Sequence, residues 1–310
     1  MQGYPRTLLE LESWFSTEQA CREYLYKLRW PNGFRCPRCG HPKAWTSKDE
    51  LFRCVACTYK TSVTAGTIFE GTRKPLSLWF RAIWWVTSQK NGASAKGLQR
   101  ILGLGSYETA WTWLHKIRRA MVRPGRDRIS GLIEVDESYI GGEKPGKRGR
   151  GASGKTLVLI AVQIVDDKKF GRIRLRRIAG ASAESLEPAI CEAAEAGSII
   201  RTDAWNGYNG LDRLGYIHEV VRKNTEVGEH LLPYCHRIAS LLKRWLMGTH
   251  QGAVSHEHLD YYLDEYTFLF NRRTSRHREM LFYRLLQNAM ETDSVKYSQL
   301  IKGVRGPIKK

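Results

Sequence analysis

Four cysteines form the most specific cluster of chemically active residues in the sequence. They make two Cys-x-x-Cys pairs, with 14 residues between the pairs: Cys36 with Cys39, and Cys54 with Cys57. Each such turn lets two thiolates converge, and two turns complete the tetrahedral shell that Zn²⁺ prefers. Because a redox Cys-x-x-Cys usually occurs singly, the spacing predicts a structural zinc ribbon whose four metal positions are all filled by the protein.

Carboxylates gather on two predicted strands further along the chain. Residues 131–140 alternate with a period of two, which places Glu134, Asp136 and Ser138 on one face of a strand. Asp203 ends a separate short strand. Crowded acids are costly unless a cation compensates their charge, and carboxylates from two strands suit two Mg²⁺ ions beside a scissile phosphate. The alternative is that these acids form ion pairs with the many arginines.

A third group is expected from a helix. His236 and Lys243 lie seven residues apart, so they share one face of the helix predicted over residues 234–247. That face could direct an imidazole at the metals and an ammonium group at a DNA phosphate, although a lone histidine on a helix can equally be structural. Four later acids are alternative third ligands that also fit a purely structural role on an amphipathic helix: Glu257, Asp260, Asp264 and Glu265.

The charge of the chain indicates a polyanionic partner. Its 310 residues include 50 Lys and Arg but 31 Asp and Glu, a formal net charge of +19, which points first to nucleic acid. No apolar run approaches the about 18 residues that would cross a membrane, and the N-terminus has no signal-peptide pattern. Seven cysteines, an odd number, argue against a disulfide framework. We therefore expect a cytoplasmic, nucleoid-associated protein without a membrane partner.

Changes of pattern divide the chain into five segments. Residues 1–30 are expected to be a helical segment, 31–72 the zinc ribbon, and 73–125 a helix-turn-helix-like DNA-binding unit. The period then changes, and 128–290 shows three strands, a helix, a strand and further helices, which indicates a mixed α/β domain. Residues 291–310 form a basic tail.

Two basic regions could contact DNA. Helices predicted over 95–102 and 107–119 are separated by Gly103 and Gly105, and the second helix could enter a major groove. A plain helical hairpin packed on the core is the alternative. The loop after the first acidic strand, residues 141–155, is rich in glycine and could hold phosphates. The candidate DNA-binding residues are Thr109, Thr112, Lys116 and Arg119 on the helix, and Lys144, Lys147, Arg148 and Arg150 in the loop.

These motifs together resemble one known family. From about residue 36 to 273, the chain is similar to insertion-sequence transposases with an N-terminal zinc ribbon and an RNase H-like catalytic domain of the DDE type. The matching pieces are CPRCG with CVAC, TWLHKIRRAM, EVDESYIGG, TDAWNGY, CHRIASLLKRWLMGTHQG and LDEYTFLFNRR.

The resemblance implies a site and a mechanism. The family's first and second aspartates fall on Asp136 and Asp203, its variable third position falls on His236, and the lysine seven residues later is Lys243. It implies catalytic Mg²⁺ or Mn²⁺. Because imidazole is a poorer ligand for hard Mg²⁺ than carboxylate, His236 could bind the metal weakly, favour Mn²⁺, or instead orient water or DNA. Metal-activated water would cut a DNA strand at the element's end, and the freed 3′-hydroxyl would attack target DNA.

The same resemblance implies double-stranded DNA as the partner, both element ends and target, and a homodimer that bridges two ends. Two other functions stay open at this point. One is a catalytically silent, transposase-derived DNA-binding regulator. The other is a nuclease or RNA-processing enzyme on the same fold, which would cleave without joining strands.

Overall fold

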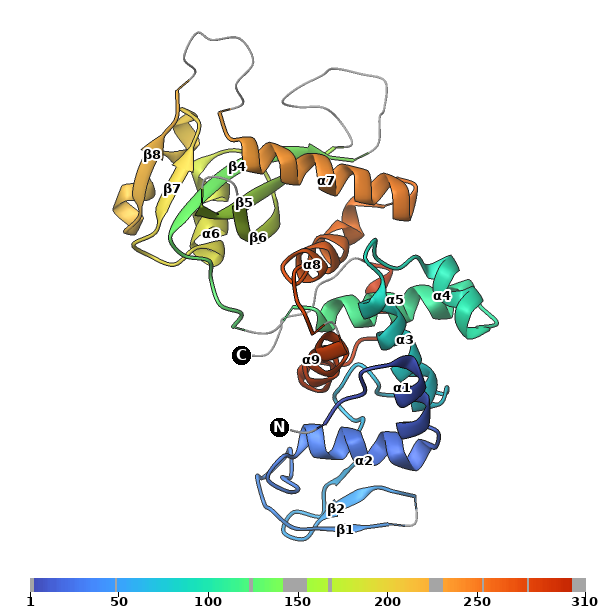
Figure 1. The fold of residues 1–310 in the computed structure, drawn as a ribbon. Helices are drawn as coiled ribbons and strands as arrows, with labels where there is room; N and C mark the ends of the chain where they lie inside the picture. Colours follow the sequence, from blue (N-terminus) through green and yellow to red (C-terminus); the bar gives the residue numbers. More distant parts are fainter. Residues whose placement is uncertain are drawn as a thin grey trace. The chain divides into compact units, whose positions relative to one another are not determined.

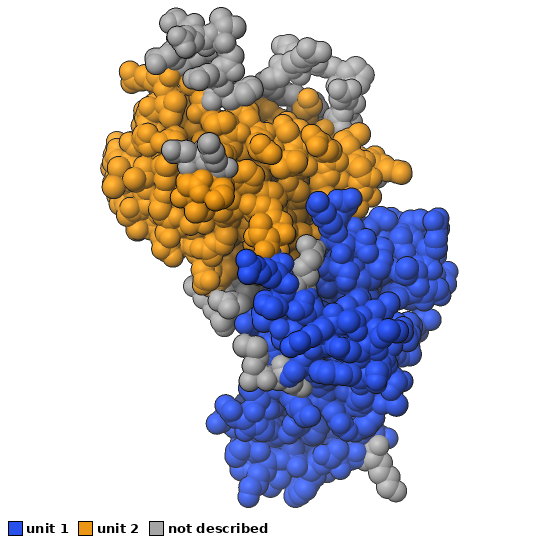
Figure 2. Space-filling view, viewed as in Figure 1, with its two compact units in different colours: residues 1–124, 275–310 blue, residues 125–274 orange. Residues whose placement is uncertain are grey.

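The chain forms two compact units in a computed structural model that describes residues 3–47, 49–122, 125–141, 155–166, 169–222, 231–252, 254–277 and 279–302. The first unit comprises residues 1–124 and 275–310, and the second comprises residues 125–274 (Figure 2). No helix in the described ranges combines the length and the apolar character needed to cross a membrane.

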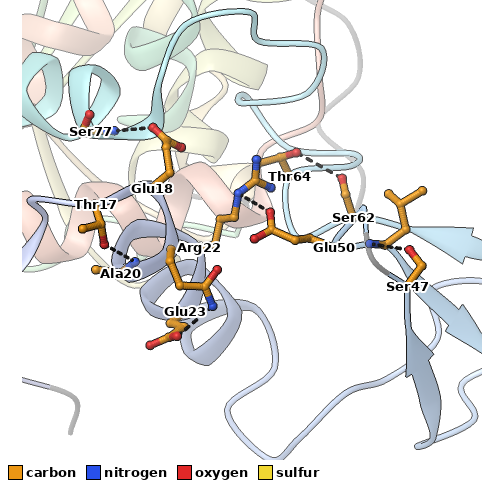
Figure 3. Close-up of polar contacts among 12 residues, drawn as sticks. Thr17, Glu18, Ala20, Arg22, Glu23, Ser47, Glu50, Ser62, Thr64 and Ser77 are labelled. Carbon is orange, nitrogen blue, oxygen red and sulfur yellow. Dashed lines mark hydrogen bonds and ion pairs between the residues drawn. The ribbon is translucent and has the colours of Figure 1, made fainter.

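The first unit begins with two capped helices and the ribbon. Threonine hydroxyls cap α1 (Leu8–Trp14) and α2 (Glu18–Arg29) by accepting hydrogen bonds from first-turn amides, at 3.1 and 3.2 Å. The ribbon is a small antiparallel sheet of β1 (Ala44–Thr46), β2 (Phe52–Cys54) and β3 (Lys60–Thr61). Figure 3 shows two links from α2: Arg22 pairs with Glu50 of the ribbon at 2.7 Å, and Glu18 accepts from the Ser77 amide at 3.4 Å.

Aromatic side chains attach the ribbon to α2. Tyr26 of the helix contacts Phe52 of the ribbon, and Trp30, directly after the helix, contacts both Phe34 and Phe52, with ring centroids 5.0 to 5.4 Å apart. Such pairs contribute roughly 0.5–1.5 kcal/mol each beyond the area they bury. The ribbon is therefore packed on its own helix rather than standing as a free module.

The rest of the first unit is helical: α3 (Leu76–Ser88), α4 (Ala95–Leu102), α5 (Tyr107–Ala120), α9 (Glu279–Glu291) and α10 (Tyr297–Leu300). Gly103 ends α4 with a φ of 62°, which confirms the predicted break between α4 and α5. The helix α9 packs against α2, α3 and α5, and its fully buried Phe282 contacts Phe15, Phe80 and Trp84. The expected catalytic segment 128–290 thus runs past the end of the second unit, since the apolar face of α9 is buried in the first.

The second unit is a mixed α/β fold around a five-stranded sheet in the order β6-β5-β4-β7-β8 (Figure 1). The strands β4 (Leu132–Ile140), β5 (Thr156–Asp166) and β6 (Lys169–Ile178) pair antiparallel, whereas β7 (Ile199–Thr202) pairs parallel with both β4 and β8 (Ile217–Val220). The strand β4 therefore lies at the centre of the sheet. The mixed sheet and its helices confirm the predicted mixed α/β class.

Helices cover both faces of this sheet, which explains the nearly continuous apolar run of β5. Its Leu157, Leu159 and Ala161 pack toward α6 (Ala183–Ala193). The alternating Val158, Ile160 and Val162 pack toward α7 (Pro233–His250) and α8 (Leu259–Phe270). Because both faces of the strand are buried, period-two amphipathicity disappears there.

Candidate functional site

The four predicted cysteines converge on one point. Their sulfur atoms all lie within 4.8 Å of one another, with Cys36 and Cys57 at 3.6 Å and Cys39 and Cys54 at 3.6 Å. Tetrahedral Zn²⁺ with Zn–S bonds of about 2.3 Å requires sulfur separations of about 3.8 Å. The cluster fits a structural zinc ion with four protein ligands, and it leaves no position open for chemistry.

Two similar turns build this cluster. In the first, the Gly40 amide donates to the Cys36 carbonyl at 2.9 Å, and in the second the Thr58 amide donates to the Cys54 carbonyl at 3.1 Å. Both donors have positive φ, 74° at Gly40 and 56° at Thr58. Glycine adopts this conformation freely, whereas a β-branched threonine is strained in it.

Asp136 and Asp203 come together in the second unit through the parallel pairing of β4 and β7. Glu134 lies opposite Arg201 in the register, so two residues further along Asp203 lies beside Asp136. Both carboxylates are half-buried. Asp136 accepts from the Glu137 amide at 2.9 Å, and Asp203 accepts from the Trp205 amide at 3.1 Å. These bonds hold each carboxylate just beyond the end of the parallel pairing between β4 and β7.

The acids of this region repel one another. Burial and, to a smaller extent, the negative charges of Glu137, Asp203 and Glu134 together raise the pKa of Asp136 to about 7. A carboxylate held in such a place is stabilised by a cation, so the donor set suits a hard divalent metal. Within the described ranges, only the cysteines bring three or more ligand atoms into one tight group. Among the described residues, the two aspartates therefore form no such group by themselves, and a metal ion held there would need further ligands.

The first turn of α7 lies near these acids. Cys235 is fully buried, and its sulfur lies 3.4 Å from the Ile160 carbonyl. Burial raises the pKa of the Cys235 thiol, and the charges of Asp136 and Glu134 add to the rise. His236, the next residue, is exposed.

Lys243 is exposed two turns further along α7. It lines a pocket that also includes Ile140 at the end of β4 and His256, while burial and the charge of Lys155 lower the lysine's pKa. The helix thus carries His236 and Lys243 along the same side of the sheet as the acids.

Glu137 and Tyr208 lie beside the candidate site and had no role in the sequence prediction. Glu137 points to the opposite face of β4, where its carboxylate accepts from the fully buried Tyr208 hydroxyl at 2.5 Å. Nearby, the Trp205 indole donates to the Ala181 carbonyl at 2.6 Å, and a Cβ at Gly207 would meet the same oxygen at 2.5 Å. Trp205 and Gly207 therefore hold the loop after Asp203 in place. The aromatic and glycine residues that directly follow this aspartate were the sequence feature that could have predicted such a loop.

The alternative acidic ligands lie on or beside α8. Asp260 pairs with Arg177 at 3.1 Å, Glu257 is exposed, and Asp264 and Glu265 are buried within the helix, where each has a partner. These surroundings fit structural roles.

The predicted DNA-binding residues of α5 are half-buried rather than open. The Thr112 hydroxyl donates to the Glu108 carbonyl at 2.7 Å, and burial lowers the pKa of Lys116. The exposed part of the helix is its start, at Tyr107 and Glu108. The other candidates, Lys144, Lys147, Arg148 and Arg150, lie outside the described residues.

Comparison with known proteins matches both units. Residues 16–60 match the transposase zinc-ribbon domain family, and residues 128–271 match the ISXO2-like transposase domain family. A curated relative, an uncharacterized protein in transposable element ISH50 of Halobacterium salinarum, is 25% identical over 270 residues, covering 80% of this chain and 89% of the relative.

A solved structure of a simian T-cell lymphotropic virus intasome, in complex with PP2A regulatory subunit B56 gamma, is 13% identical with a TM-score of 0.31. It covers 62% of this chain and 71% of that one, a likeness too weak to carry an argument. The two family matches span more than half of the chain. The chain belongs to the insertion-sequence transposases that combine a transposase zinc ribbon with an ISXO2-like transposase domain.

Proposed function

We propose that this chain cuts DNA at the ends of its insertion sequence and joins the 3′ ends to target DNA by two-metal phosphoryl transfer. The observation that carries the proposal is the adjacency of Asp136 and Asp203 on paired parallel segments, within a domain of a transposase family. The five-stranded mixed sheet with helices on both faces supports an RNase H-like architecture for this unit.

Asp136, Asp203 and two residues of α7 would have different roles in the reaction. Asp136 and Asp203 would hold Mg²⁺ or Mn²⁺, which when bound would activate the attacking oxygen and stabilise the leaving oxygen. The His236 imidazole would complete the site, either as a ligand better suited to Mn²⁺ than to Mg²⁺ or by orienting water or DNA. Lys243 would place a phosphate of the DNA strand beside the carboxylates, because its ammonium group lines the pocket that reaches the end of β4.

Double-stranded DNA is the partner that the charge favours. The formal net charge is +19, and Arg35, Arg38, Arg53 and Lys60 are exposed around the zinc ribbon. Phosphate contacts by such residues release counterions, which drives binding. We propose that the ribbon and helical unit hold the element ends, and that a homodimer brings two ends together on the nucleoid. The silent regulator is not favoured, because both aspartates are present and adjacent.

The test is a strand-cleavage assay on labelled DNA that carries the element's own ends, with Mg²⁺ or Mn²⁺. Wild type should cleave and join, whereas Asp136→Asn and Asp203→Asn should each lose more than about 100-fold in rate, because each removes a metal ligand. Glu192→Gln is the matched control, since this exposed acid lies on α6 and pairs with Arg176. Tight end binding without cleavage in either metal would leave the regulator, and cleavage without joining would leave the nuclease.

A further inference from the structure

Glu134 is a buried acid on the central strand that the proposed chemistry does not use. Its relative exposure is 1%, and it lies two residues before Asp136 on the same face of β4. Burying a charged carboxylate is costly unless hydrogen bonds compensate for the lost water. The partners of Glu134 therefore indicate why an acid is retained there.

Those partners are backbone amides at the start of α7. The Glu134 carboxylate oxygen Oε2 accepts from the Tyr234 amide at 2.9 Å and from the Cys235 amide at 3.2 Å. The first amides of a helix have no partner inside it, and Leu232 at the N-cap position supplies no side-chain bond. The carboxylate thus replaces the missing cap, and its negative charge also interacts favourably with the helix dipole.

This capping joins the two elements that carry the site. Cys235 directly precedes His236, and Glu134 is two residues from Asp136, so a single carboxylate links the strand of one candidate to the helix of the other. We propose that Glu134 is a positioning residue that fixes the first turn of α7 to β4 and thereby sets the place of His236 relative to Asp136 and Asp203. This inference rests on the proposed function.

A metal-binding role for Glu134 fits the contacts less well. Its Oε2 atom already accepts two amide hydrogens, and the side chain is almost fully covered. Catalytic geometry is sensitive to small displacements of the groups that hold the reacting atoms. Loss of the cap should therefore act on the reaction through His236 rather than directly.

Two readouts on the full-length protein test this inference. The first is hydrogen exchange of α7. Glu134→Ala should speed exchange of the Tyr234 and Cys235 amides by on the order of tenfold, because it removes charge-assisted bonds. Glu134→Gln keeps a carbonyl acceptor and should show a smaller increase, and it also serves if the alanine variant fails to fold. Glu192→Gln, which removes an acid from α6, should leave these amides unchanged.

The second readout is a double-mutant cycle on DNA cleavage. Glu134→Ala should lower the rate by about tenfold or more in the wild-type background, but by less than about threefold when His236 is already alanine, because residues acting through one another are not additive. Equal losses in both backgrounds, or unchanged exchange at the start of α7, would overturn the inference. If wild type cleaves no DNA, the proposed function fails, and the exchange result alone decides whether Glu134 anchors α7.

Discussion

The cysteine cluster and the proposed acid site differ in how completely the protein itself could hold a metal ion. In the ribbon, four sulfur atoms lie within 4.8 Å of one another and all come from one short segment. At the proposed acid site, two carboxylates from distant segments lie beside one another and repel, so a metal ion there would need further ligands. The difference teaches that a structural site is closed by its own protein ligands, whereas a site meant for chemistry keeps positions for water and substrate.

Removing one ribbon ligand should have the largest effect. Cys54→Ser leaves three thiolates, and because structural zinc contributes about 10–16 kcal/mol to folding in small zinc modules, we expect the ribbon to lose its metal and its order. Elemental analysis should find one equivalent of zinc fewer than in wild type, and Cys191→Ser, a lone half-buried cysteine on α6, should keep its zinc. Full zinc retention by Cys54→Ser would show that the four cysteines do not form one site.

Loss of the hydrogen bond between Tyr208 and Glu137 should have the next largest effect on stability. Tyr208→Phe removes the hydrogen bond between the buried Tyr208 hydroxyl and the half-buried Glu137 carboxylate, and it should cost about 2 kcal/mol of unfolding free energy because hydrogen bonds to charged groups contribute more than neutral ones. Urea denaturation measures this change. Tyr216→Phe is the matched control, since its hydroxyl donates to a neutral carbonyl of Ala194 at 3.1 Å and should cost only about 1 kcal/mol. Equal losses of unfolding free energy in both variants would show that the bond from Tyr208 to the Glu137 carboxylate is no stronger than a bond to a neutral carbonyl.

Asp136→Asn should have a smaller and opposite effect on stability. Because burial and the neighbouring acids disfavour the Asp136 charge, its removal should raise the melting temperature by on the order of 3 °C without divalent cations. Calorimetry of both proteins with and without Mn²⁺ provides the measurement. Added Mn²⁺ should raise the melting temperature of wild type but not of the variant. A lower melting temperature for the cation-free variant would contradict the repulsion at this site.

The smallest effect is expected within the ribbon itself. Thr58 holds a φ of 56° where the equivalent Gly40 holds 74°. Thr58→Gly should relieve strain, and after the added freedom of the unfolded chain we expect a gain of about 0.5 kcal/mol. Gly40→Thr should destabilise the ribbon. Competition with a zinc chelator measures both variants, and a loss of zinc affinity in Thr58→Gly would show that the turn is not strained.

Several features of this structure could be predicted from the sequence because they depend on the spacing of residues that are close together in the chain. The cysteine turns, the strand β4, and the break at Gly103 between two helices depend on neighbouring residues, and the structure confirms all three. The adjacency of Asp136 and Asp203 depends on pairing across 67 positions of sequence. The acids themselves suggested a shared metal site, and the family resemblance added which two aspartates would form it.

Other features depended on packing that no local pattern carries. Lys116 is half-buried, and the charge of Glu70, 46 positions earlier in the sequence, acts on it. The packing of α9 with α2 and α3 joins opposite ends of the chain, and the capping of α7 by Glu134 joins residues 100 positions apart. DNA contact by Thr109, Thr112, Lys116 and Arg119 stays a prediction.

Titration calorimetry with Mn²⁺ on the zinc-loaded protein tests most directly whether the acid pair is a cation site. Wild type should bind Mn²⁺, and Asp136→Asn and Asp203→Asn should each weaken that binding by at least about tenfold, whereas Glu192→Gln should bind as wild type does. Unchanged Mn²⁺ binding in both aspartate variants would contradict the assignment of Asp136 and Asp203 as the metal-holding residues of this transposase.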